Sequence, residues 1–194
     1  MKGRGRRLSS DKKPIFPNRR SAVISIAVIL FLLVFATIAI DQNNVSRLKK
    51  YHKEAVVLLE KGMGEMDSRF SYTEALVGLL DDQRLAAPFL PLFEAYSGQD
   101  SPAVLSTLYI GLDRAVLELQ KAVFTHEHYL LYAAYFEKIY ECEQALAKDL
   151  DLYNEKAAYY NRQKAAFPAS LAARRLGMES LELFTLGPAI QGRP

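Results

Sequence analysis

Residues 153–177 read YNEKAAYYNRQKAAFPASLAARRLG and repeat a pair of residues that begins with an aromatic side chain. The pairs recur at a spacing of seven: Tyr153-Asn154, Tyr160-Asn161 and Phe167-Pro168. Counting back by sevens gives further apolar or aromatic residues: Leu146, Ile139 and Tyr132. Such a repeat places one apolar stripe along a helix that packs in a bundle. We therefore predict a long helix from about residue 127 to residue 166, ended by Pro168, with Tyr160 and Phe167 in the core.

Asn154 and Asn161 each follow a core aromatic residue, so both lie at the edge of this stripe, about 10 Å apart along the helix axis. Their side-chain amides could hydrogen-bond across to another helix and fix its register, as single polar residues do in coiled coils. A ligand or partner surface is the alternative. We expect the structural role, because the repeat follows the packing period and no charged partner accompanies the two asparagines.

At these residues the chain resembles the LemA family. The C-terminal motif of that family reads Tyr-Asn, five residues, Tyr-Asn, five residues, Phe-Pro, and then a glycine nine residues after the proline, which here is Gly177. Three upstream groups also resemble family motifs: Glu143-Gln144, Leu146-Ala147, and Arg69 with Leu76-Val77. The chain departs from the family at Glu74-Ala75, where the family has Pro-Asn, and at Met178, where it has an aromatic residue. The resemblance implies a membrane-anchored helical bundle of a bacterium.

The composition favours an all-α fold. Among 194 residues, half are hydrophobic, and there are only ten glycines and eight prolines. We predict an antiparallel up-and-down bundle of about four helices over residues 41–177, followed by a flexible C-terminal tail, residues 178–194. The single cysteine, Cys142, excludes an intramolecular disulfide, and we expect it to pack in the core.

The N-terminal region combines a basic tail with an apolar stretch. Residues 1–20 hold eight Lys or Arg against one Asp, a net charge of +7, which leaves −4 for the rest of the chain. Residues 21–40 carry no charge and are long enough to cross a bilayer. Basic residues beside such a span mark the cytoplasmic side, and this explains the tail better than nucleic-acid binding does. We expect an uncleaved anchor in membrane lipid, a cytoplasmic tail and an extracytoplasmic bundle, in a bacterial cytoplasmic (inner) membrane.

The helices between the anchor and the long helix follow from apolar spacing and turn residues. The membrane helix is expected to continue as the first bundle helix until residues 62–67 interrupt it, and a second helix is expected over residues 68–87. Pro88 and Pro91 then break the chain, and residues 97–100 form a turn. A third helix begins after Ser101-Pro102, with an apolar seam that includes Leu105, Leu112 and Leu119.

The histidines and acidic residues do not fall at spacings that would bring them together as metal ligands or catalytic groups. His126, Glu127 and His128 are adjacent and point to different faces of a helix, and His52 has no second ligand near it. Acid pairs such as Asp149 and Asp151 are expected on solvated faces. We therefore expect no catalytic residue, no metal and no cofactor, and a non-enzymatic interaction or scaffold protein with an unidentified protein partner. The alternatives are a ligand- or signal-sensing bundle and a membrane-anchored hydrolase.

Overall fold

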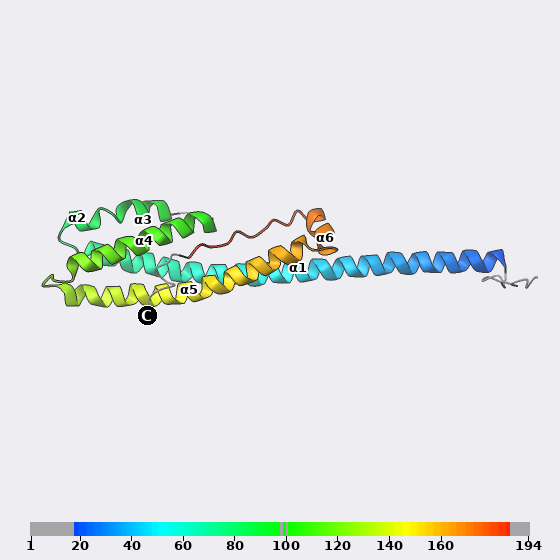
Figure 1. Ribbon diagram of the computed structural model, residues 1–194, viewed down its shortest axis with the longest axis horizontal. Coiled ribbons are helices and arrows are strands. Elements are labelled where there is room, and N and C mark those ends of the chain that lie inside the picture. The colour runs from blue at the N-terminus through cyan, green and yellow to red at the C-terminus, as the bar shows by residue number, and fades with distance from the viewer. Residues whose placement is uncertain (1–17, 98, 100, 187–194) are drawn as a thin grey trace, which may run out of the picture. The chain divides into compact units, whose positions relative to one another are not determined.

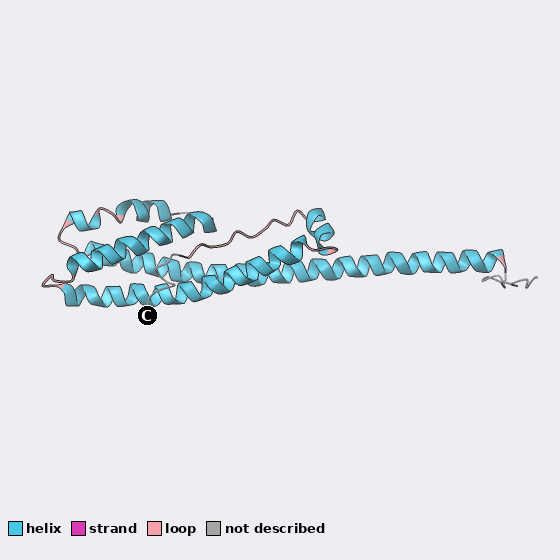
Figure 2. Cartoon of the chain, in the orientation of Figure 1, coloured by secondary structure: helices cyan, strands magenta, loops and turns pink. Residues whose placement is uncertain are grey.

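The computed structural model describes residues 18–97, 99 and 101–186, and these residues form helices and no strands (Figures 1 and 2). The helices are α1 (Arg19–Gly78), α2 (Gln83–Ala86), α3 (Leu90–Tyr96), α4 (Pro102–Val123), α5 (Tyr129–Ala165) and α6 (Ala169–Arg175). The predicted all-α fold is confirmed. The basic tail up to residue 17, two positions of the predicted turn at 97–100, and residues 187–194 lie outside the described residues.

The chain divides into two units after Asn43, and the first contains the beginning of α1. This part of α1 is long and apolar enough to cross a membrane, which makes it a candidate membrane span. Its large side chains are exposed in the structure, for example Phe31 at 69% and Phe35 at 64%. An apolar helix without a packed face needs an apolar surrounding, and a bilayer provides one.

α1 continues to Gly78 without a break, so the predicted interruption at residues 62–67 and the separate second helix over 68–87 are wrong. The reason lies in packing at Gly62, which is buried against α5. A β-carbon at this position would lie 3.0 Å from Leu150 Cδ2, so the glycine permits a close approach of the two helices. The glycine weakens the helix locally, but tertiary contacts outweigh that cost.

Residues 44–186 build the bundle, in which successive helical segments alternate in direction along the long axis of Figure 1. The part of α1 that follows residue 43 runs in one direction, α2 and α3 run back, α4 returns, and α5 runs back again. The predicted seams are largely confirmed, because the heptad residues of α4 and α5 are buried: Leu105, Leu112, Leu119, Tyr132, Ile139, Leu146, Tyr153 and Tyr160. Their burial, at roughly 1.5 to 3 kcal/mol for each large apolar side chain, is the main favourable contribution to the free energy of folding.

Phe167 does not belong to this core. Its side chain is 81% exposed, so the prediction of a buried Phe167 is wrong. The stripe ends because α5 ends at Ala165, and Ala166 is already extended, at φ −77° and ψ 143°. Beyond the end of a helix the seven-residue period no longer places a side chain on the same face.

Gly177 ends α6 and redirects the chain. Its φ is +60°, and the backbone N–H groups of Gly177 and Met178 donate to the carbonyl oxygens of Arg174 and Ala173, respectively. These two bonds form a Schellman motif, which favours glycine because the left-handed conformation is strained for other residues. From here residues 178–186, which we call the C-terminal segment, run without secondary structure back along α5 (Figure 1). Residues 178–186 of the predicted flexible tail make the contacts described next.

Candidate functional site: a Tyr-Asn clamp on α5

Asn154 and Asn161 each hold one residue of the C-terminal segment by both of its main-chain groups. The Asn154 amide donates to the Phe184 carbonyl oxygen at 2.7 Å and accepts from the Phe184 N–H at 2.8 Å. Asn161 makes the same pair of bonds with Leu181, at 2.8 and 2.9 Å. The side-chain amide thus pairs with the segment as a neighbouring strand would, and the predicted bond across to another helix is wrong in its partner.

The tyrosine that precedes each asparagine also binds the main chain of the segment. The Tyr153 hydroxyl donates to the Glu182 carbonyl oxygen, and the Tyr160 hydroxyl donates to the Glu179 carbonyl oxygen at 3.0 Å. Each Tyr-Asn pair therefore binds two residues of the segment that are two positions apart. We call the four side chains of Tyr153, Asn154, Tyr160 and Asn161 the Tyr-Asn clamp.

The two Tyr-Asn pairs make the same bonds because seven residues of α5 and three residues of the extended segment cover similar lengths. Seven residues of an α-helix span about 10.5 Å. Three residues of an extended, polyproline-like chain span about 9.3 Å. A step of seven along α5 therefore corresponds to a step of three along the segment, from Phe184 to Leu181 for the asparagines and from Glu182 to Glu179 for the tyrosines.

Apolar side chains anchor the segment at the same two positions that the asparagines hold. Phe184 is 2% exposed and lies edge-on to Tyr109 of α4, with ring centroids 6.1 Å apart. Leu181 is partly buried and packs against the core. The neighbouring Thr185 N–H donates to the Ser106 hydroxyl of α4 at 2.8 Å, so the segment contacts both α4 and α5.

Burial changes the acidity of the clamp tyrosines. The pKa of Tyr153 is raised by desolvation and, to a smaller extent, by the charge of Glu182, and the pKa of Tyr160 is raised by desolvation. Both hydroxyls therefore keep their protons in the neutral pH range and act as donors to the segment.

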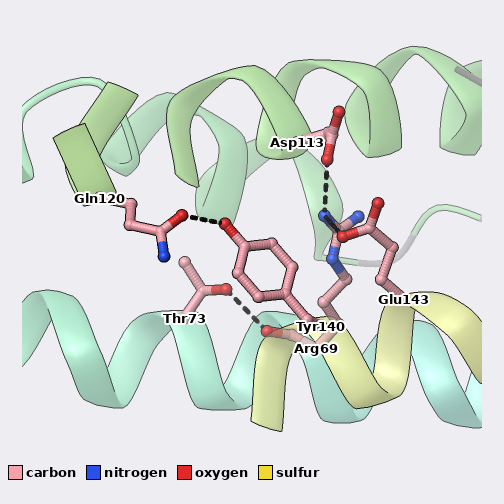
Figure 3. Close-up of polar contacts among 6 residues, drawn as sticks. All are labelled: Arg69, Thr73, Asp113, Gln120, Tyr140 and Glu143. Carbon is pink, nitrogen blue, oxygen red and sulfur yellow. Dashed lines mark hydrogen bonds and ion pairs between the residues drawn. The ribbon is translucent and has the colours of Figure 1, made fainter. Parts of the chain in front are cut away.

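A buried charge cluster joins the three long helices next to this region (Figure 3). Arg69 of α1 is fully buried, and its Nη2 lies 3.2 Å from Asp113 Oδ1 of α4 and 3.3 Å from Glu143 Oε2 of α5. Its guanidinium also lies over the Tyr109 ring, 4.9 Å from the centroid. A buried cation between two carboxylates costs desolvation, so we expect it to act mainly by fixing which helices meet and in which register.

Sequence reasoning did not assemble this cluster. Arg69 and Glu143 stood out only through their resemblance to family motifs, and Asp113 did not stand out at all. The available signal was a charged residue inside an apolar helical stripe, as Asp113 is beside Leu112. Because Arg69 and Glu143 are 74 positions apart in the chain, no local pattern connects them.

The other residues with candidate chemistry are placed as follows. His126, Glu127 and His128 are exposed in the turn between α4 and α5, and among the described residues no group of three or more His, Cys, Asp or Glu could hold a metal ion. Cys142 is buried, as predicted, and burial raises the pKa of its thiol. Asp151 is exposed as expected, but Asp149 is 3% exposed and pairs with Lys61 at 2.9 Å, so the expectation of a solvated Asp149 is wrong.

Comparison with protein-family models, with curated proteins and with solved structures gave no match to this chain. The class that the fold and the site define is thus an all-helical bundle with one candidate membrane span and a clamp for an extended main chain.

Proposed function

We propose that the chain is a membrane-anchored, non-enzymatic interaction protein of the LemA type, in which residues 21–40 cross the bacterial cytoplasmic membrane and the bundle lies outside the cytoplasm. The uncharged apolar stretch supports the anchor, and the net charge of +7 before it supports the orientation.

The observation that carries the proposal is the chemistry of the Tyr-Asn clamp. The most regular polar residues of the chain bind carbonyl oxygens and N–H groups of a polypeptide. Side chains that hold an extended main chain are suited to recognition.

Two measurements test the proposal. A reporter fused after Pro194 that is active only in the cytoplasm is expected to stay silent, and a strong signal would contradict the orientation. Photo-crosslinkers placed at the exposed residues Leu183 and Lys148 are then activated in native membranes. We expect a discrete protein adduct whose yield depends on the position of the crosslinker. Absence of any adduct at these and further exposed positions of the bundle would contradict an interaction protein.

A second candidate function, ligand sensing, is favoured by a groove of about 540 Å³ between α2–α3 and α4. Its floor is apolar and includes Phe89, Leu92 and Leu119. Its charged lining residues are Arg84, Arg114 and Glu118, which leaves one cation in excess. An apolar floor beside cations suits an amphipathic anion. We expect dodecanoate to raise the melting temperature of the full-length protein more than dodecanol does. Equal shifts for the two compounds, or none, would remove this candidate.

A further inference from the structure

The Tyr-Asn clamp recognises atoms that every polypeptide has. All six hydrogen bonds that its four side chains make with the C-terminal segment end on main-chain N–H or C=O groups of the segment. Bonds of this kind do not depend on which side chains the bound residues carry. Glu179, Ser180, Glu182 and Leu183 are exposed. Outside the clamp, the Ser180 hydroxyl accepts from Lys164 Nζ at 2.6 Å, and Glu182 Oε2 accepts from the Ser101 hydroxyl at 3.3 Å.

The clamp nevertheless sets three requirements for what it binds. The bound chain must be extended, so that residues three positions apart reach both asparagines. The residues at those two positions must be apolar, as Leu181 and Phe184 are, because their side chains pack toward the core. They cannot be proline, because each donates its N–H to an asparagine oxygen.

Residues 179–186 of the C-terminal segment are held without main-chain pairing to the bundle. Among the described residues, no backbone–backbone hydrogen bond joins them to a helix, and side chains of α4 and α5 bond several of their N–H and C=O groups instead. The helices therefore keep all their own main-chain bonds when the segment leaves. Release would uncover polar side chains, which water can solvate, and an apolar recess at Phe184.

We infer that the Tyr-Asn clamp is a binding site for an extended segment of another protein, with apolar residues three positions apart, and that residues 179–184 occupy this site as an internal competitor. The inference rests on the proposed function and specifies the chemistry of its partner. Peptides that bind by main-chain hydrogen bonds gain their affinity from the backbone and their specificity from side-chain pockets, and both parts are present here.

Tethering makes the internal segment a strong competitor. A segment joined by a short connection acts at an effective concentration on the order of mM. A free peptide of the same sequence therefore binds the intact protein weakly, and it binds much more tightly once the internal segment is weakened.

The test uses the full-length protein in detergent micelles and a fluorescein-labelled peptide with the sequence of residues 178–186, MESLELFTL. The variant Phe184→Asp places a carboxylate in the apolar recess and releases the internal segment. By fluorescence anisotropy we expect the peptide to bind this variant at least tenfold more tightly than the wild type. Adding Asn154→Ala and Asn161→Ala should abolish binding, whereas the exposed substitution Glu155→Ala should leave it unchanged.

Two modified peptides test the mode of recognition. N-methylation at the positions of Leu181 and Phe184 removes both N–H donors and keeps both side chains, and we expect it to abolish binding. Alanine at the position of Glu179 should leave the affinity within about threefold, because the clamp reaches this residue through its carbonyl oxygen. Insensitivity to N-methylation would overturn the inference.

A measurement on the wild type covers the case in which Phe184→Asp does not fold. Hydrogen exchange at the Leu181 and Phe184 amides should be slow, and mM peptide should accelerate it while the Leu112 amide of α4 stays unchanged. Unchanged exchange at mM peptide would overturn the inference. Dimers of the full-length protein that dissociate on adding peptide would show that a second copy is the occupant, which would also overturn it. Crosslinked adducts in membranes without peptide binding would leave the proposed function standing and refute the clamp as its site.

Discussion

The Asn154 side-chain amide and the Phe184 backbone form a closed ring of two hydrogen bonds, 2.7 and 2.8 Å long. Seven residues further along α5, Asn161 forms the same ring with Leu181. The repetition explains why Tyr-Asn recurs at a spacing of seven: each pair serves one three-residue step of an extended chain.

The first prediction concerns these rings. Asn154→Ala and Asn161→Ala each remove two hydrogen bonds, which contribute on the order of 1 kcal/mol apiece, so each variant should lose about 1 to 3 kcal/mol of unfolding free energy. Chemical denaturation of the full-length protein measures the loss. The exposed control Glu155→Ala should change it by about 0.5 kcal/mol or less. Equal effects of the three substitutions would show that the rings do not hold the segment.

The second prediction concerns the buried cation. Arg69→Met leaves Asp113 and Glu143 facing each other without Arg69, and we expect a loss of about 3 to 5 kcal/mol in unfolding free energy. Replacing all three residues, with Arg69→Met, Asp113→Leu and Glu143→Leu, should recover most of that loss, because an apolar cluster carries no desolvation cost. A triple variant no more stable than Arg69→Met would indicate that the charges are needed for more than their mutual pairing.

The third prediction compares two glycines in α1. Gly64→Ala meets no atom within 4 Å of its new methyl group, and the higher helix propensity of alanine should raise the unfolding free energy by about 0.5 to 1 kcal/mol. Gly62→Ala places its methyl group 3.0 Å from Leu150 Cδ2, so it should gain less than Gly64→Ala or lose stability. Thermal melting of the two variants side by side decides this. Equal gains would mean that α1 and α5 are not closely packed at Gly62.

The fourth prediction concerns alkaline pH. Because the pKa values of Tyr153 and Tyr160 are raised in the folded protein, the unfolded chain loses these protons first, near the ordinary tyrosine pKa of about 10. Their contribution to stability is therefore complete below about pH 10 and is lost as the pH rises through the folded pKa values. Unfolding free energies measured from pH 8 to 11.5 should fall less steeply for the double variant Tyr153→Phe, Tyr160→Phe. A double variant that keeps the wild-type slope would contradict this prediction.

The helical content and the two main seams were predictable, because burial of one face imposes a period that the sequence shows directly, from Leu105 to Leu119 and from Tyr132 to Tyr160. The continuity of α1 through Gly62 was not predictable, since glycine usually marks a break and only the approach of Leu150 explains it here. Phe167 fits the seven-residue period by its position in the sequence, so its burial was predicted. That period places side chains on one face only within a helix, and α5 ends at Ala165.

For the Tyr-Asn clamp, the position of the side chains was predictable from the sequence, but their binding partner was not. The position of Asn154 and Asn161 at the edge of the seam follows from the helix alone, and so does their capacity for paired hydrogen bonds. Their partner does not, because residues 178–186 have no helical or strand periodicity and are placed by side chains from elsewhere in the chain. The cluster of Arg69, Asp113 and Glu143 was not predictable for a related reason, because charge pairing between distant helices leaves no local period in the sequence.

The residues of the Tyr-Asn clamp are synthesised before the segment that they bind. Asn154 precedes its partner Phe184 by 30 residues, and a ribosome adding about 5 to 20 residues per second needs roughly 1.5 to 6 s to cover that interval. Binding of the segment by the clamp can therefore occur only after α5 and α6 have both been synthesised, which makes it a late step in the assembly of the bundle.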